Sequence, residues 1–227
     1  NQIEQGMRKI ADRGATMIVG MGFAQADAIG AVAADYPDIK FVAVDVCWLD
    51  DPNNNIYQAC YKEHEGSFLV GMMAAMASKS GTIGFVGGMD IPLIRKFQGG
   101  YEQGAQYVNP DITVLANMTG TTNEAWNNPT KGAELTKAQI DGGADVVYQA
   151  AGGTGIGVLQ AAADAGIMGI GVDSNQNWMH PGTMLTSMLK RLDLTIFEQA
   201  QNVAKGSFES GINILGLSEG MLGYATE

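Results

Sequence analysis

Short runs of apolar and β-branched residues alternate along the chain with longer runs in which apolar positions recur at helical spacing. The short runs predict strands at residues 15–20, 40–46, 55–61, 81–88, 111–118, 144–151, 167–173 and 183–189. The longer runs predict helices at residues 1–14, 23–35, 64–78, 91–108, 129–141, 153–166 and 190–206. Strands that alternate with helices of this length are typical of an α/β fold with a parallel sheet.

The composition of the strands indicates how each one is covered. Most of them are nearly continuous apolar runs, as expected when helices cover both faces of a sheet. The run "NIYQACY" alternates instead, which predicts an edge or surface strand.

Strand–helix units recur before about residue 80 and again from about residue 82, which indicates two similar lobes. We expect lobe 1 in residues 1–84, lobe 2 in residues 85–182, and a return to lobe 1 in residues 183–227. The short crossings near residues 84–90 and 182–190 are the candidate hinges. The chain opens on a helix and closes just after a strand, so a strand and helix are expected before its start and further elements after its end.

Composition narrows the class of protein. The 227 residues are 46% hydrophobic and 16% charged, an ordinary balance for a soluble globular chain. The net charge of -11 and the lack of a Lys/Arg cluster argue against DNA or RNA as a partner. No apolar run reaches the roughly 18 residues of a membrane span, and residues 1–227 contain no signal-peptide pattern.

The sequence contains no recognisable motif for binding a metal ion or a cofactor. Two histidines and no Cys-x-x-Cys or His-Glu-x-x-His spacing argue against a metal site, and we expect no cofactor. Cys47 and Cys60 are expected to be buried free thiols, with a disulfide between them as the alternative.

The stretch "AAGGTGIGVLQAAADAGIMGIGVDSNQ" resembles a nucleotide-binding unit at first sight. A dinucleotide site needs Gly-x-Gly-x-x-Gly, but Val158 stands three residues after Gly155. No Lys-Ser/Thr pair follows the glycines either, so a phosphate loop is also excluded. What remains around Gly153 is a helix start whose backbone N–H groups could bind ligand oxygens, or a compact turn.

Two polar residues end predicted strands. Asp173 ends "IMGIGVD" and Lys190 follows "TMLTSML". Ligands of open α/β sheets bind at the carboxyl ends of the strands, where a carboxylate can accept hydrogen bonds from sugar hydroxyls. The alternatives are an N-cap of the following turn for Asp173 and a solvated side chain for Lys190.

Aromatic residues follow two other strands. Trp126 lies in a polar loop, either as a platform for a flat ring or packed on its own lobe. Gly22 and Phe23 follow the first strand, and Phe23 is equally explained as a core residue. The acidic stretch "DVCWLDDPNNN" is typical of a turn. The sequence contains neither a nucleophile elbow nor a nucleophile paired with a histidine, so we expect that the protein is not an enzyme.

Four segments, taken together and in order, resemble the basic membrane protein (BMP) family of ABC-transporter substrate-binding lipoproteins, of the purine nucleoside receptor type. They are "GTIGFVGGMDIPLIRKFQGGYEQGAQYVNPDI", "VVYQAAGGTGIGV", "IGVDSNQ" and "LTSMLKR". The resemblance implies a two-lobed type I periplasmic-binding-protein fold, each lobe a parallel sheet flanked by helices, with hinge strands between them. It also implies capture of a nucleoside, with purine nucleosides as the expected class, by hinge closure, and delivery to an ABC permease from the periplasm or cell surface.

The resemblance assigns roles to individual residues. Asp173 and Lys190 are similar to a ribose-contacting pair, and Gly153 to a backbone contact. Trp126 matches an aromatic residue that stacks on the base, and Gly22 with Phe23 matches the cleft edge of lobe 1 loosely.

One departure from the family pattern limits what can be carried over. The base-reading Asp-x-Ser-Phe-Asn segment is expected before residue 1, so the preferred base and any N-terminal lipid anchor stay open. Riboflavin and sugars remain alternative ligands, and a nucleoside-processing enzyme is the less favoured reading.

Overall fold

The computed structural model describes residues 2–227 and divides into two compact units. Unit 1 comprises the described residues up to Tyr61 together with Arg191–Met221, and unit 2 comprises Lys62–Lys190 and Leu222–Glu227. The chain passes between the units after Tyr61, Lys190 and Met221. The first passage lies well before the crossing expected near residues 84–90, whereas the second lies at the end of the crossing expected near residues 182–190. The reason for the first shift is that the helix after residue 62 packs on the helix after residue 91, within unit 2.

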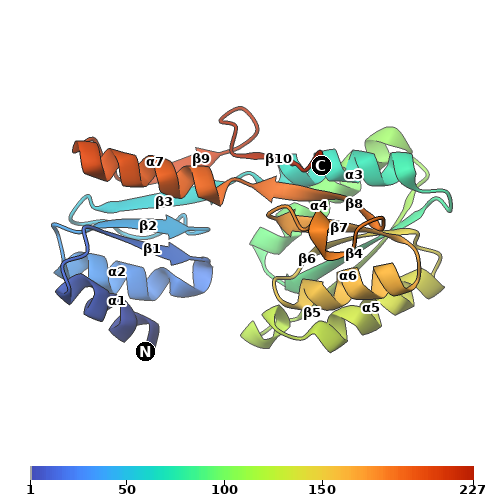
Figure 1. Cartoon of the computed structure of the whole chain (residues 1–227), viewed down its shortest axis with the longest axis horizontal. Coiled ribbons are helices and arrows are strands. Elements are labelled where there is room, and N and C mark those ends of the chain that lie inside the picture. Colours follow the sequence, from blue (N-terminus) through green and yellow to red (C-terminus); the bar gives the residue numbers. More distant parts are fainter. Residues whose placement is uncertain (1) are drawn as a thin grey trace. The chain divides into compact units, whose positions relative to one another are not determined.

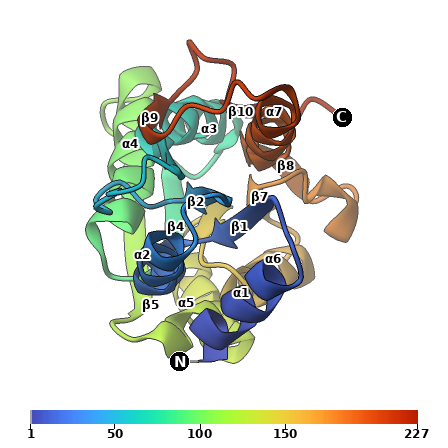
Figure 2. The ribbon, with the colours of Figure 1, turned by 90° about the vertical axis from the view of Figure 1, so that its left-hand side faces the viewer.

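Unit 1 is built on a sheet of four parallel strands in the order β1-β2-β3-β9 (Figure 1). The strands are β1 (Met17–Met21), β2 (Lys40–Val44), β3 (Ile56–Tyr61) and β9 (Gly211–Leu215). Its helices are α1 (Gln2–Asp12), α2 (Ala26–Asp35) and α7 (Leu192–Lys205), with a short 3-10 turn, η1, at Phe23–Gln25. In Figure 2, α7 lies on one side of these strands and α1 with α2 on the other.

The core of unit 1 follows the alternation of β2. Phe41 and Ala43 are fully buried on the face that α1 and α2 cover, together with Ile29 and Val32 of α2 and Met7 of α1. This burial is the main favourable contribution to folding of the unit.

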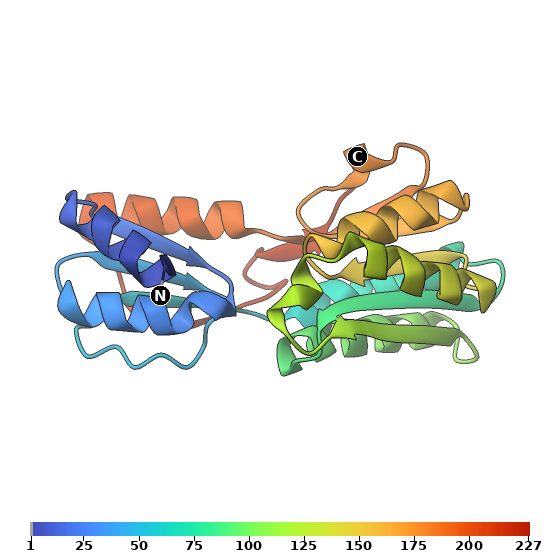
Figure 3. The same ribbon diagram turned by 90° about the horizontal axis from the view of Figure 1, so that it is seen from below.

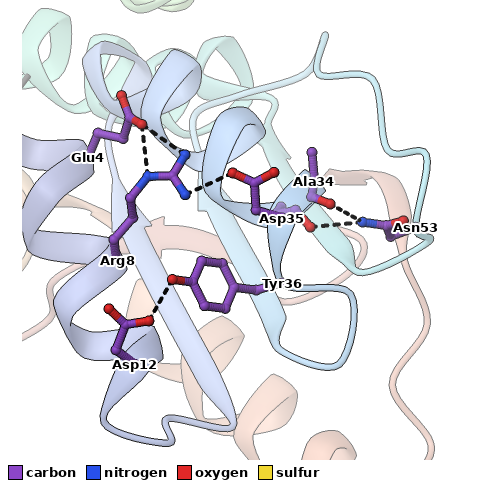
Figure 4. Close-up of polar contacts among 8 residues, drawn as sticks. Glu4, Arg8, Asp12, Ala34, Asp35, Tyr36 and Asn53 are labelled. Atoms are coloured by element: carbon purple, nitrogen blue, oxygen red, sulfur yellow. Dashed lines mark hydrogen bonds and ion pairs between the residues drawn. The ribbon is translucent and has the colours of Figure 1, made fainter.

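A polar cluster ties α1 to the end of α2 on the surface of unit 1 (Figure 4). Arg8 donates hydrogen bonds to Glu4 at 2.9 Å and to Asp35 at 2.8 Å, and the Tyr36 hydroxyl donates to Asp12 at 2.7 Å. The bonds to Asp35 and Glu4 raise the pKa of Arg8, and the bond to Asp12 raises the pKa of Tyr36. Because these groups are exposed, they orient α1 more than they stabilise it.

The loop between β2 and β3 is tied to β3 by a disulfide. Cys47 and Cys60 are bonded, with their Cα atoms 5.8 Å apart, so the expectation of free thiols is wrong. The Gln58 amide donates to the Leu49 carbonyl at 2.8 Å and accepts from the Leu49 N–H at 2.9 Å. Both links hold this loop against its neighbouring strand.

Strand β3 is not the edge strand that its alternation predicts. All six of its residues are buried, and it lies between β2 and β9. Its polar position is Gln58, which is satisfied by the loop backbone and not by solvent. A strand was expected shortly before the end of the chain but was given no residue range, so β9 was not predicted as the second neighbour of β3.

Unit 2 is built on a six-stranded sheet in the order β10-β8-β7-β6-β4-β5, parallel except for β10. The strands are β4 (Thr82–Met89), β5 (Thr113–Gly120), β6 (Val146–Ala150), β7 (Met168–Asp173), β8 (Met184–Lys190) and β10 (Leu222–Tyr224). The helices are α3 (Glu63–Ala77), α4 (Pro92–Val108), α5 (Pro129–Asp141) and α6 (Thr154–Asp164), with 3-10 turns η2 (Asn123–Trp126) and η3 (Asn177–Met179). Helices α3 and α4 cover one face of the sheet, and α5 and α6, in front in Figure 3, cover the other.

Glycines allow α3 and α4 to pack unusually close. A Cβ at Gly100 of α4 would lie 2.6 Å from the His64 Cα, and one at Gly71 of α3 would lie 2.9 Å from the Tyr101 carbonyl carbon. Real Cβ atoms do not approach other atoms so closely, so these positions need glycine in this packing.

None of the helices described in residues 2–227 has both the length and the apolar character of a membrane span.

Candidate functional site

The parallel strands of unit 2 all end at one edge of the sheet, which we call the carboxyl edge: the ends of β5, β4, β6, β7 and β8, in that order. Asp173 is the last residue of β7 and Lys190 the last residue of β8. The two strands are paired, with Asp173 opposite Leu189, so the two side chains are neighbours. The Lys190 Nζ lies 3.9 Å from the Asp173 Oδ1.

The backbone at Asp173 has a left-handed conformation, with φ of 66°. Non-glycine residues adopt this conformation uncommonly, and Asp is among those that tolerate it best. The side chain is 48% exposed, so the carboxylate is open to a ligand as well as to Lys190.

A network of buried amides holds the turn after Asp173. The Gln176 Oε1 accepts from the Val172 N–H and from the Gln149 Nε2, both at 2.9 Å. The Gln149 Oε1 in turn accepts from the Ala151 N–H at 3.1 Å. These bonds link the ends of β6 and β7. Neither glutamine was predicted from the sequence, in which the only signal is that Gln149 lies near the end of β6 and Gln176 lies in the turn after β7.

Lys190 is not the solvated side chain that was the alternative interpretation. Its side chain is 2% exposed, because β8 lies between β7 and β10 and is covered by α3. Its Nζ also lies 5.6 Å from the centre of the Phe97 ring, within range of a cation–π interaction.

A second carboxylate, that of Glu63, also lies near the Lys190 ammonium and was not predicted from the sequence. Glu63 is the first residue of α3 and its side chain is 1% exposed. The Glu63 Oε1 lies 3.9 Å from the Lys190 Nζ, and the Oε2 lies 3.5 Å from the Lys96 Nζ. The only sequence signal is an acidic residue directly after a buried strand, which most often marks a helix start.

The phenol of Tyr148 lies among these charges. Burial raises the pKa of Tyr148, the hydrogen bond to Ser67 at 3.3 Å lowers it, and the carboxylates of Asp173 and Glu63 raise it further. The net direction is upward, so the phenol stays neutral and the charged groups of this region are the carboxylates and lysines.

Gly153 and Trp126 lie further along the same edge. Gly153 caps α6 after β6, and a Cβ there would lie 3.1 Å from the Trp126 carbonyl oxygen. The Trp126 ring packs on Gly88 of β4 and close to Gly152. The ring is therefore supported by its own unit while remaining partly exposed, so both interpretations of Trp126 stay open.

Gly22 and Phe23 lie in unit 1, at the carboxyl end of β1. Gly22 has φ of 90°, which requires glycine, and its N–H donates to the Val44 carbonyl at 3.2 Å. Phe23 begins the 3-10 turn η1 and is partly buried.

The chemistry available at the carboxyl edge is hydrogen bonding. An open carboxylate accepts from hydroxyl groups, and a buried ammonium donates to oxygen atoms. Among residues 2–227, no three His, Cys, Asp or Glu side chains are grouped so that they could hold a metal ion.

Comparison with known proteins gives one consistent result. The family model described as "ABC transporter substrate-binding protein PnrA-like" matches residues 1–227. Basic membrane protein A2 of Borrelia garinii subsp. bavariensis is 31% identical over 99% of this chain and 67% of its own length. The ABC transporter nucleoside-binding protein BmpA of Lactococcus lactis is 33% identical over 88% of this chain, which spans 60% of that protein.

Two further relatives are informative. An uncharacterized lipoprotein of Pyrococcus furiosus is 34% identical over 92% of this chain and 54% of its own length. The crystal structure of an ABC transporter solute-binding protein from Aeropyrum pernix superposes with a TM-score of 0.87 at 31% identity, over 98% of this chain and 64% of that one. This match confirms the predicted α/β class with parallel sheets flanked by helices. The chain belongs to the PnrA-like family of ABC transporter substrate-binding proteins, which are binding proteins and not enzymes.

Proposed function

We propose that this chain captures a nucleoside, with purine nucleosides as the expected class, for an ABC importer. The observation that carries the proposal is the pair of Asp173 and Lys190, whose charged atoms are 3.9 Å apart at the carboxyl edge of unit 2. The Lactococcus relative is named as a nucleoside-binding protein, which supports a nucleoside over the sugar and flavin alternatives.

The two side chains suit the ribose of a nucleoside. The exposed Asp173 carboxylate would accept hydrogen bonds from two vicinal hydroxyls, because each carboxylate oxygen can accept independently. Lys190 would donate to a ribose oxygen while offsetting the carboxylate charge. An uncharged ligand then leaves the total charge of the site unchanged.

Trp126 and Gly153 would act beside this pair, further along the same edge. The partly exposed indole would stack on the base, and the N–H groups at the start of α6 would bind ligand oxygens. Contacts from Gly22 and Phe23, and closure of the two units on the ligand, remain predictions from the resemblance.

The setting follows from the relatives. A substrate-binding protein delivers its ligand to a membrane permease, so we propose an ABC permease as the partner and an extracytoplasmic location. The Pyrococcus relative is named as a lipoprotein, which supports attachment at the outer cell surface through a lipid anchor.

Calorimetric titration with ribonucleosides, 2′-deoxyribonucleosides, free bases, riboflavin and ribose tests the proposal. We expect ribonucleosides to bind most tightly, and Asp173→Asn to weaken their binding about ten- to a hundredfold, because a hydrogen bond to a charged group contributes about 1.5–3 kcal/mol. The matched control is Asp164→Asn, at an exposed position of α6, which should leave the affinity unchanged.

Two outcomes would refute the proposal. Preference for riboflavin or free ribose would keep the binding protein and replace its ligand. Equal ribonucleoside affinity of Asp173→Asn and the wild type would remove Asp173 from the ribose site.

A further inference from the structure

Four charged side chains form an alternating chain in unit 2, from α4 to the carboxyl edge. They are Lys96, Glu63, Lys190 and Asp173, with successive charged atoms 3.5, 3.9 and 3.9 Å apart. The two inner members, Glu63 and Lys190, are almost fully buried, whereas the two outer ones are each 48% exposed. The inner pair therefore has the environment in which an unbalanced charge is most costly.

The position of Glu63 is fixed by close packing of α3. A Cβ at Gly66 would lie 3.0 Å from the Met188 Sδ of β8, and Ser67 is hydrogen-bonded to Tyr148 of β6 at 3.3 Å. Glu63 is one turn earlier on the same helix, at its N-terminus, where the helix dipole favours a carboxylate. The carboxylate is thus held beside the end of β8.

Burial works against the charge on Lys190. Removal of an ammonium from water disfavours the protonated form, and a carboxylate nearby restores it. Asp173 alone provides a partial counter-charge, because its own carboxylate is half exposed and screened by solvent. Glu63 is equally distant from the Lys190 Nζ and is not exposed, so it is the stronger influence on that ammonium.

We infer that Glu63 is a positioning residue for the ligand site, which keeps the Lys190 ammonium charged and fixed beside Asp173. It acts through Lys190, and it does not contact the ligand. This inference rests on the proposed function for its effect on affinity, but its effect on Lys190 is independent of any ligand.

The first test is an NMR titration of the lysine 13Cε signals without ligand, with Lys190 assigned from a Lys190→Met variant. The groups around the Lys190 ammonium include Glu63 on α3, Asp173 on β7 and Tyr148 on β6, and Lys96 pairs with the other carboxylate oxygen of Glu63. We expect Lys190 to lose its proton at a lower pH in Glu63→Gln than in the wild type, because the variant lacks the buried carboxylate that favours the charged ammonium. Superimposable titrations of Lys190 in the two proteins would overturn the inference.

The second test is the affinity for the best-bound ribonucleoside as a function of pH. Glu63→Gln should weaken binding about tenfold at pH 7 and increasingly at higher pH, while the wild type stays flat over the same range. In a Lys190→Met background the same change should matter by less than about twofold, because Glu63 acts through Lys190. A tenfold loss that persists without Lys190 would contradict this role.

Two further variants separate positioning from general damage. Glu65→Gln is the matched control: it lies in the same helical turn, its side chain is 27% exposed and it pairs with Lys62, so less than about twofold is expected. Glu63→Asp keeps the charge and should retain more affinity than Glu63→Gln. If the wild type binds no nucleoside, the proposed function fails, while the Lys190 titration still decides the inference.

Discussion

The close packing of α3 on α4 makes opposite predictions for two adjacent glycines of α4. A Cβ at Gly99 would meet nothing within 4 Å, whereas one at Gly100 would lie 2.6 Å from the His64 Cα and 2.8 Å from the His64 carbonyl carbon. Both residues are helical, so both gain the same helix propensity from substitution by alanine. The two variants therefore differ in packing alone.

The magnitude follows from the contact. Ordinary contact begins at 3.4 Å, so at Gly100 the His64 Cα must move by about 0.8 Å, and the His64 carbonyl oxygen, which is nearer, must move further. Overpacking of a dense core costs about 1–3 kcal/mol, and the upper end applies because backbone atoms cannot rotate away. The helix propensity of alanine returns about 1 kcal/mol. We expect Gly99→Ala to stabilise unit 2 by about 1 kcal/mol and Gly100→Ala to destabilise it by about 2 kcal/mol.

Urea unfolding measures both changes. In a Trp48→Phe background, tryptophan fluorescence reports on unit 2 through Trp126 and Trp178. The urea midpoint multiplied by the slope of the transition gives the free energy of unfolding. Because His64 follows Glu63 directly, Gly100→Ala should also weaken ligand binding, and Gly99→Ala should not. A Gly100→Ala midpoint at or above that of Gly99→Ala would refute the close packing of the two helices.

Three further predictions concern other parts of the chain. Replacement of Cys47 and Cys60 by serine should lower the free energy of unfolding by about 3 kcal/mol, as expected for a disulfide that closes a loop of this length. The wild type under reducing agent should unfold at the same urea concentration as this double variant. Burial raises the pKa of Asp145, but hydrogen bonds from Ser78 and two backbone N–H groups bring it below 3.8. The Asp145 carboxylate therefore stabilises the fold at neutral pH, and this stabilisation is lost in acid. The difference in free energy of unfolding between the wild type and Asp145→Asn should narrow as the pH falls below 3.8. Gln149→Met should cost about 1–3 kcal/mol in the same assay, because it removes the partner of a buried N–H.

The sequence predicted the strands of unit 2 except β10, because these strands are mostly apolar runs that end at a polar or glycine residue. Asp173 and Lys190 were found by this rule: each is the last residue of such a strand, and parallel strands end at the same edge. Their neighbouring positions follow from the pairing of β7 with β8.

Unit 1 shows where the local pattern fails. Gln58 interrupts the apolar run of β3, and the sequence gives no sign that the backbone of the β2–β3 loop, tied by Cys47 and Cys60, satisfies the Gln58 amide. In β9, Ile212 and Ile214 are 56% and 60% exposed, so the strand lacks the burial that makes apolar periodicity informative. Its position beside β3 depends on pairing between residues far apart in the sequence.

Glu63 was not predicted as a site residue, because its role also depends on contacts between distant parts of the chain. On its own element it reads as an acidic residue at a helix start, which is common and requires no partner. Its importance comes from the packing of α3 across the end of β8, which places its carboxylate beside an ammonium that is 2% exposed. A lysine at a strand end can be solvated, so the sequence could not say that Lys190 needs a counter-charge. Once the structure shows that Lys190 is buried, the cost of an unbalanced charge requires a carboxylate nearby, and Glu63 is the buried one.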